Sequence, residues 1–153
     1  MTQQDKELLL KDLCARLPYG IKMLHKGWNY EWDDELSTIE RVIGLDEHFI
    51  YTKVIDTHTG EEYRDDRHSI NTFDDKLFLR PMSGMTKEEK RECFETAILY
   101  SVDANGRLHF DGFGNLNAEE TVEAFDWLNA HHFDYRGLIE KSLALEAPEV
   151  MYK

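Results

Sequence analysis

Residues 19 to 80 contain no segment with helical periodicity, and this feature constrains the fold more than any other. The segments LSTIERVIG (residues 36–44) and HFIYTKVID (residues 48–56) are rich in the β-branched and aromatic side chains that favour strands. A short turn at residues 44–47 joins them, which predicts an antiparallel hairpin. We interpret YGIKMLHKG, HSINTF and KLFLRP as shorter strands. This part of the chain is therefore predicted to form an antiparallel β-meander or a small barrel-like sheet.

Helical patterns flank these strands. A helix is expected from residue 4 to residue 17, where leucines recur at helical spacing before Pro18. After residue 85, capping boxes at Thr86–Glu89 and Asn117–Glu120 begin two helices, and an Asn-Gly turn between them predicts a short hairpin. Asp134 is expected to cap a last helix over YRGLIEKSLALE, residues 135–146.

The predicted fold class is α+β. It consists of an N-terminal helix, a strand-rich part over residues 19–81, and a helical C-terminal half over residues 85–146 with a short hairpin. The sequence contains no internal repeat and no long linker. A chain of 153 residues is then most simply one domain, residues 1–153.

The net charge narrows the classes of partner. The chain has 31 acidic and 18 basic residues, and its formal net charge is −13. Nucleic-acid binding needs Lys or Arg to neutralise phosphates, so we expect no direct binding unless five basic residues converge: Lys22, Lys26, Lys53, Arg64 and Arg67. The acidic surface favours solubility. If its carboxylates gathered on one face, the protein would instead be an acidic nucleic-acid mimic that binds a host protein.

Cysteines and hydropathy indicate the compartment. Cys14 and Cys93 have no CxxC spacing, and both are expected to be small buried hydrophobic residues, Cys14 on the apolar side of the first helix. The start of the chain lacks the pattern of a signal peptide, and no stretch reaches the length of a membrane span. We expect a cytoplasmic protein with no membrane association and no cofactor.

The stretch WLNAHHFDYRG (residues 127–137) contains two adjacent histidines. Adjacent residues on a helix point about 100° apart, so His131 and His132 cannot easily share an ion. We interpret both as packing residues at a helix end. The alternative is a metal-assisted hydrolase, which would need both histidines and Asp134 to meet His109 and Asp111.

The segment KGWNYEWDDE is the main candidate for a binding site. In an extended segment, Trp28, Tyr30 and Trp32 would project from the same face. Carboxylates crowd beside them: Glu31, Asp33 and Asp34, followed by Glu35. Aromatic rings flanked by carboxylates suit a partner that carries Arg, Lys or another cation, although large aromatic residues are more often buried in a core. The segment is therefore a candidate surface for binding another protein.

Three stretches carry a family resemblance: CARLPYGIK, LFLRPMSGMTKEEK and WLNAHHFDYRGLIEKSLALEAP. They resemble a group of small proteins of unknown function encoded by gut Bacteroidetes, often within prophages and other mobile elements. The resemblance implies no activity, ligand or catalytic residue. It implies a bacterial or phage setting, where small accessory proteins often bind other proteins. We therefore expect a non-enzymatic interaction or regulatory protein.

Overall fold

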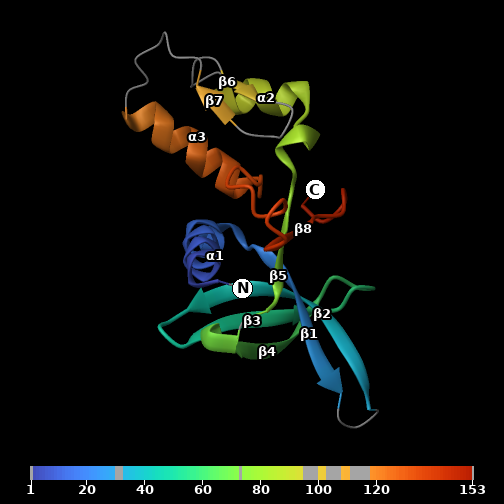
Figure 1. Cartoon of the computed structure of the whole chain (residues 1–153). Helices are drawn as coiled ribbons and strands as arrows, with labels where there is room; N and C mark the ends of the chain where they lie inside the picture. The colour runs from blue at the N-terminus through green and yellow to red at the C-terminus, as the bar shows by residue number, and fades with distance from the viewer. Residues whose placement is uncertain are drawn as a thin grey trace. The chain divides into compact units, whose positions relative to one another are not determined.

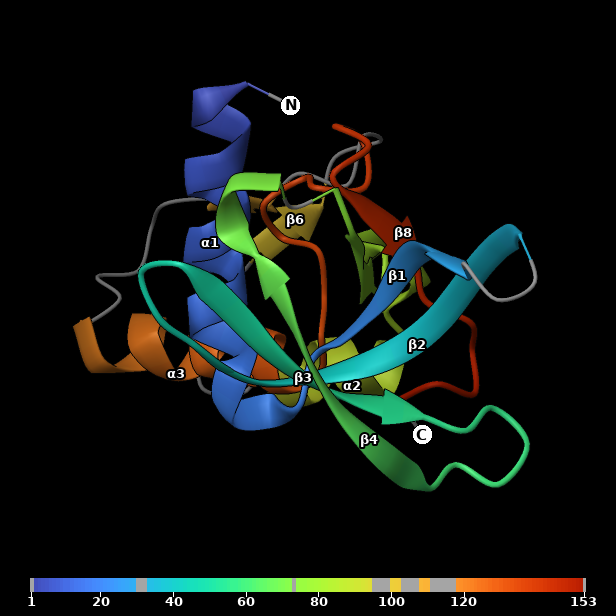
Figure 2. The same cartoon turned by 90° about the horizontal axis from the view of Figure 1, so that it is seen from below.

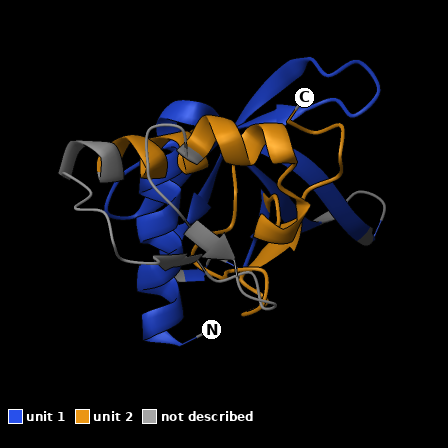
Figure 3. Cartoon of the chain, turned by 90° about the horizontal axis from the view of Figure 1, so that it is seen from above, with its two compact units in different colours: residues 1–78 blue, residues 79–153 orange. Residues whose placement is uncertain are grey.

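The computed structural model describes residues 2–29, 33–72, 74–94, 100–102, 108–110 and 118–152 (Figure 1). The chain divides into two compact units, residues 1–78 and residues 79–153 (Figure 3). The prediction of one domain stays a prediction. No helix in the described ranges is both long and apolar enough to cross a membrane.

The first unit begins with helix α1 (Gln3–Arg16). A capping box begins the helix, because the Thr2 hydroxyl accepts the Asp5 N–H and the Asp5 carboxylate accepts the Thr2 N–H. The N-terminal helix is therefore confirmed. Cys14 is exposed, so the prediction that it is buried is wrong. It lies about 100° around the helix from the fully buried Leu13, outside the buried face.

Five strands follow, and they account for most of the predicted strand-rich part. They are antiparallel neighbours in the order β4-β3-β2-β1-β5. Figure 2 shows how strongly the strands of the β1–β4 region twist. The predicted hairpin between residues 36–44 and 48–56 is confirmed as the β2–β3 pair. The bounds are β1 Lys22–Asn29, β2 Asp34–Leu45, β3 Phe49–Ile55, β4 Glu62–Ser69 and β5 Lys76–Leu79.

The connection from β4 to β5 differs from the prediction. HSINTF was expected to be a strand, but β4 ends at Ser69 and residues Ile70–Thr72 form a turn of 3-10 helix. The Ile70 N–H donates to the His48 carbonyl rather than to a strand partner. This turn leads the chain from β4, at one edge of the sheet, to β5 beside β1.

One face of this sheet is buried. Alternate residues of β3 are fully buried, namely Ile50, Thr52 and Val54, as the two-residue period of a strand requires. Met23 on β1 and Val42 on β2 are also buried. We call this side the inner face. It contains polar side chains as well as apolar ones, and these polar residues form the site described below.

The second unit contains two of the predicted helices and the predicted hairpin. The predicted capping box begins α2 (Lys87–Phe94), because the Thr86 N–H donates to Glu89 and the Glu89 N–H donates to the Thr86 hydroxyl. Strands β6 (Tyr100–Val102) and β7 (Leu108–Phe110) pair as the predicted hairpin. Helix α3 spans Ala118–Ala130. The Asn117 cap lies outside the described residues.

The end of the chain corrects one helix prediction. Residues 135–146 form a series of turns and then strand β8 (Ala144–Glu146), not a helix. Gly137 has φ +69°, which breaks helical geometry there, although the Asp134 carboxylate still accepts the N–H groups of Leu138 and Ile139 as a cap would. The chain is α+β as predicted. Its sheet, however, is a mixed one of six strands, with β8 after β5, and not an antiparallel meander alone.

Candidate metal centre

Four ionisable side chains meet on the inner face of the first unit's sheet. His25 comes from β1, Glu40 from β2 and His68 from β4, while Asp75 immediately precedes β5. The strand period places them there, because Glu40 lies two residues from the buried Val42 and His68 pairs with the buried Ile50. Successive members of this cluster are 7 to 28 residues apart in the sequence, so no local sequence motif contains them.

The two imidazole rings and Asp75 are in direct contact. The His25 Nδ1 atom lies 2.8 Å from Asp75 Oδ1, and the centroids of the two rings are 4.1 Å apart, at an interplanar angle of 38°. Strands β2 and β3 separate β4 from β1 in the sheet, so this contact requires the sheet to curl. The His68 Nδ1 atom lies 4.0 Å from Asp75 Oδ2, too far for a hydrogen bond.

The other nitrogen of His68 faces Glu40. His68 Nε2 lies 2.6 Å from Glu40 Oε2, and Glu40 is fully buried. Two hydroxyls complete its surroundings: Thr52 donates to Oε2 at 2.6 Å and Thr38 donates to Oε1 at 2.7 Å. Burial opposes ionisation of Glu40, but the hydrogen bonds from His68, Thr52 and Thr38 outweigh it and lower the pKa of this carboxyl to about 2.

The same contacts set the charge of His68. Burial disfavours the imidazolium, but the hydrogen bond to Glu40 and the negative charges of Glu40, Asp75 and Asp66 raise the pKa of His68 above its ordinary value. The cluster is therefore a carboxylate–imidazole–carboxylate arrangement of Glu40, His68 and Asp75. His25 gives it access to solvent, since its side chain is 25% exposed, against 9% for His68 and 8% for Asp75.

These donors have the composition of a metal site. His25, His68 and Asp75 each offer one ligand atom, and the three atoms lie within 4.8 Å of one another. Of the residues that the structure describes, no other set of three His, Cys, Asp or Glu side chains is arranged in this way. Glu40 then stands behind His68 as a hydrogen-bond acceptor, the usual companion of a histidine that binds a metal.

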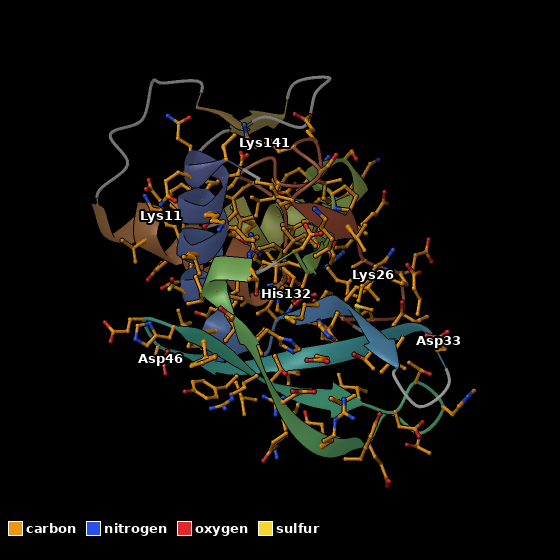
Figure 4. All side chains as sticks on the ribbon, turned by 60° about the horizontal axis from the view of Figure 1, so that its bottom comes forward. Lys11, Lys26, Asp33, Asp46, His132 and Lys141 are labelled. Carbon is orange, nitrogen blue, oxygen red and sulfur yellow. The ribbon has the colours of Figure 1, made fainter. Side chains whose placement is uncertain are left out.

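The predicted aromatic segment connects β1 to β2 in the chain. The backbones of Trp28 and Asp34 belong to the last pairs of these two strands, but their side chains lie outside the described residues, as do Tyr30, Glu31 and Trp32 altogether. Asp33 is exposed with φ 52° just before β2 (Figure 4). The binding role of residues 28–34 stays a prediction.

The C-terminal histidines have other partners. The His131 ring stacks on Trp127 at 3.8 Å, and its Nδ1 lies 2.9 Å from the Trp127 carbonyl. His132, labelled in Figure 4, has φ 58° and stacks on Tyr152 at 3.9 Å. These contacts agree with the interpretation of both histidines as packing residues at a helix end. The side chain of His109, and Asp111, lie outside that part.

Three of the five basic residues considered for nucleic-acid binding contact other side chains of the sheet. Lys53 pairs with Asp65 at 2.6 Å, and Arg64 pairs with Asp66 at 3.1 Å. Arg67 lies over the Phe49 ring at 4.9 Å. Arg64 pairs with the buried Val54, and Lys53 is the residue before Val54 on β3. Lys53 and Arg64 therefore lie on opposite faces of the sheet. The strand register places Lys22, Lys26 and Arg67 on the same face as Lys53. The nucleic-acid alternative therefore stays a prediction.

Comparisons with protein-family models, with curated proteins and with solved structures found no match to this chain. The class of site therefore depends on its own geometry: two imidazoles and one carboxylate in a curled sheet, with a second carboxylate hydrogen-bonded behind one imidazole.

Proposed function

We propose that this chain is a metal-binding protein whose His25, His68 and Asp75 side chains hold one zinc ion. The observation that carries the proposal is the gap of 4.0 Å between His68 Nδ1 and Asp75 Oδ2. Two atoms bound to a tetrahedral zinc ion lie about 3.3 Å apart, so a small inward movement of either side chain lets both bind one ion. The third donor, His25, already contacts the same carboxylate.

The donor types select the class of metal. Two imidazoles and one carboxylate suit zinc and other first-row transition metals, whereas calcium and magnesium prefer oxygen ligands alone. Two histidines with one carboxylate also form the ligand set of non-haem iron(II) sites. Binding would release the proton of His68 Nδ1 where His68 is charged and would break the hydrogen bond between His25 Nδ1 and Asp75 Oδ1. It would place a positive charge between carboxylates in an acidic protein.

A buried polar network without a metal is the competing interpretation. Such a network stabilises a fold when every member is satisfied by hydrogen bonds. Glu40 fits that description, whereas His68 Nδ1 and Asp75 Oδ2 lie 4.0 Å apart, beyond hydrogen-bond distance of each other. The metal proposal accounts for this separation.

The test is a titration of the purified, chelator-treated protein with zinc chloride, followed by isothermal calorimetry. We expect one zinc per chain. His68→Ala and Asp75→Asn should each weaken binding at least about tenfold. Binding at the same affinity in both variants would overturn the proposal, as would no binding by the native sequence. Iron(II) under anaerobic conditions is the parallel titration, and tighter binding of iron would reassign the metal.

The chain offers matched controls. His58 is exposed in the turn between β3 and β4, and Asp74 is the exposed neighbour of Asp75. His58→Ala and Asp74→Asn remove the same chemical groups without touching the cluster, so zinc binding should stay unchanged in both. Circular dichroism of every variant separates a lost ligand from a lost fold.

Binding of another protein through residues 28–34 stays a second prediction, because the aromatic side chains lie outside the described residues. A cytoplasmic setting and a phage or mobile-element origin also stay predictions.

A further inference from the structure

Resting on the proposed function, we infer that Glu40 is a positioning residue of the metal centre: it keeps the proton of His68 on Nε2 and thereby directs Nδ1 to the ion. Neutral histidine carries its proton on either nitrogen, and the hydrogen bond made by one nitrogen decides which atom is left to bind a metal. In this protein Nε2 has a carboxylate at 2.6 Å, whereas Nδ1 faces the proposed ion position near Asp75.

Glu40 is placed to support a ligand and not to be one. Its Oε2 atom accepts from His68 and from the Thr52 hydroxyl, and its Oε1 atom accepts from the Thr38 hydroxyl. It is fully buried. These three contacts fix the direction of the carboxylate, so the imidazole plane of His68 is fixed in turn. An ionised acceptor also makes the imidazole a stronger electron donor to a metal.

The two threonines connect this arrangement to the strands. Thr38 is two residues from Glu40 on β2, on the same face, and Thr52 lies on the neighbouring strand β3. Each hydroxyl can donate only one proton, and both protons point at Glu40. The carboxylate is therefore held by side chains from β2, β3 and β4 at once, independently of any ion.

The first measurement uses the native sequence. Nitrogen-15 NMR of the zinc-loaded protein distinguishes the two tautomers of His68 by the chemical shifts of the ring nitrogens. We expect Nε2 to carry the proton and Nδ1 to show the shift of a metal-bound nitrogen. Assignment of the His68 signals comes from their loss in His68→Ala. A spectrum with zinc on Nε2 would overturn the inference while leaving zinc binding itself intact.

The second measurement uses Glu40→Gln, which keeps the size of the side chain and removes its charge. We expect zinc affinity to fall by about tenfold to a hundredfold, the usual effect of losing an outer hydrogen-bonding partner of a ligand. A second variant, Thr38→Val, keeps the Glu40–His68 contact and loses one hydroxyl, so we expect a smaller loss. Native affinity in a folded Glu40→Gln protein would contradict the inference.

The outcomes separate the two proposals. No zinc bound by the native sequence refutes the metal site and this inference together. Zinc bound with native affinity by Glu40→Gln, or through Nε2 of His68, refutes only the role of Glu40. If Glu40→Gln does not fold, the tautomer measured in the native protein still decides the question.

Discussion

Glu40 on β2 and His68 on β4 form a buried hydrogen-bonded pair across the intervening strand β3, with 2.6 Å between Oε2 and Nε2. Removing two charged groups from water costs several kcal/mol for each ion, and only good geometry with further hydrogen bonds offsets this cost. The two threonine hydroxyls on Glu40 supply such bonds. The pair therefore links the edge strand of the sheet to its centre through a defined geometry.

This pair makes the metal-free protein sensitive to acid. The pKa of Glu40 is about 2 in the folded protein, below its ordinary value of 4.5, so its contribution to stability is complete above pH 4.5 and is lost as the pH falls toward 2. The loss is about 3 kcal/mol over this window. Urea unfolding of the native protein and of Glu40→Gln measures it, since the difference in unfolding free energy should shrink as the pH falls. A difference that is constant with pH would contradict the prediction.

Zinc should stabilise the first unit through strand β4. This strand is at the edge of the sheet and pairs only with β3 in the strand order, whereas His68 at its end would share the ion with His25 on β1. At a hundredfold excess of free zinc over Kd, we expect about 2.7 kcal/mol of added stability. Thermal unfolding with and without zinc measures the total. Hydrogen exchange should show the largest added protection in β4 and little in α1.

A second buried ion pair belongs to helix α1 and lies outside the proposed metal site. The Arg16 guanidinium donates to both oxygens of Asp12, from Nε at 2.7 Å and from an η nitrogen at 3.1 Å, and both side chains are fully buried. Asp12→Ala leaves a buried cation without this carboxylate, so we expect a loss of about 3 to 5 kcal/mol in urea unfolding. The double variant Asp12→Leu/Arg16→Met removes both charges and should recover most of the loss. If it is as unstable as the single variant, the pair itself is required.

The two cysteines should differ in reactivity. Cys14 is exposed, whereas burial raises the pKa of the Cys93 thiol to about 12. Because the thiolate is the reactive form, iodoacetamide at neutral pH should label Cys14 and leave Cys93 unmodified in the native protein. Mass spectrometry of tryptic peptides gives the ratio. Equal labelling of both in urea is the control, and equal labelling without urea would contradict the packing of Cys93.

Local sequence signals predicted the elements that depend on few residues. The β2–β3 hairpin followed from β-branched residues and a short turn, and helix α2 followed from the Thr86–Glu89 capping box. The helix predicted over residues 135–146 was wrong because its apolar pattern reflects burial in turns. Leu138 and Leu143 are buried there, while Gly137 has a positive φ that interrupts a helix.

The candidate site could not be predicted from the sequence, for a physical reason. His25, Glu40, His68 and Asp75 occupy the same face only in the observed strand register, and a shift by one residue would move a strand's side chains to the opposite face. Contact between His25 and His68 also depends on the curl of the sheet, which no local pattern encodes. The adjacent His131 and His132 were conspicuous in the sequence, yet they close a helix.

Gly27 controls the space beside His25. A Cβ atom at this position would lie 3.0 Å from His25 Nε2, closer than ordinary van der Waals contact. Gly27→Ala should therefore displace the imidazole ring by a few tenths of an ångström and weaken its contact with Asp75. This displacement uses up most of the about 0.5 Å within which ligand positions need to be held, so we expect zinc affinity to fall only roughly threefold while the fold is kept. Calorimetric titration of Gly27→Ala measures the effect.

Gly44→Ala is the matched control on β2, because the nearest atom to its Cβ is a Tyr51 ring carbon at 3.9 Å, an ordinary contact. Native zinc affinity in Gly27→Ala would contradict this prediction.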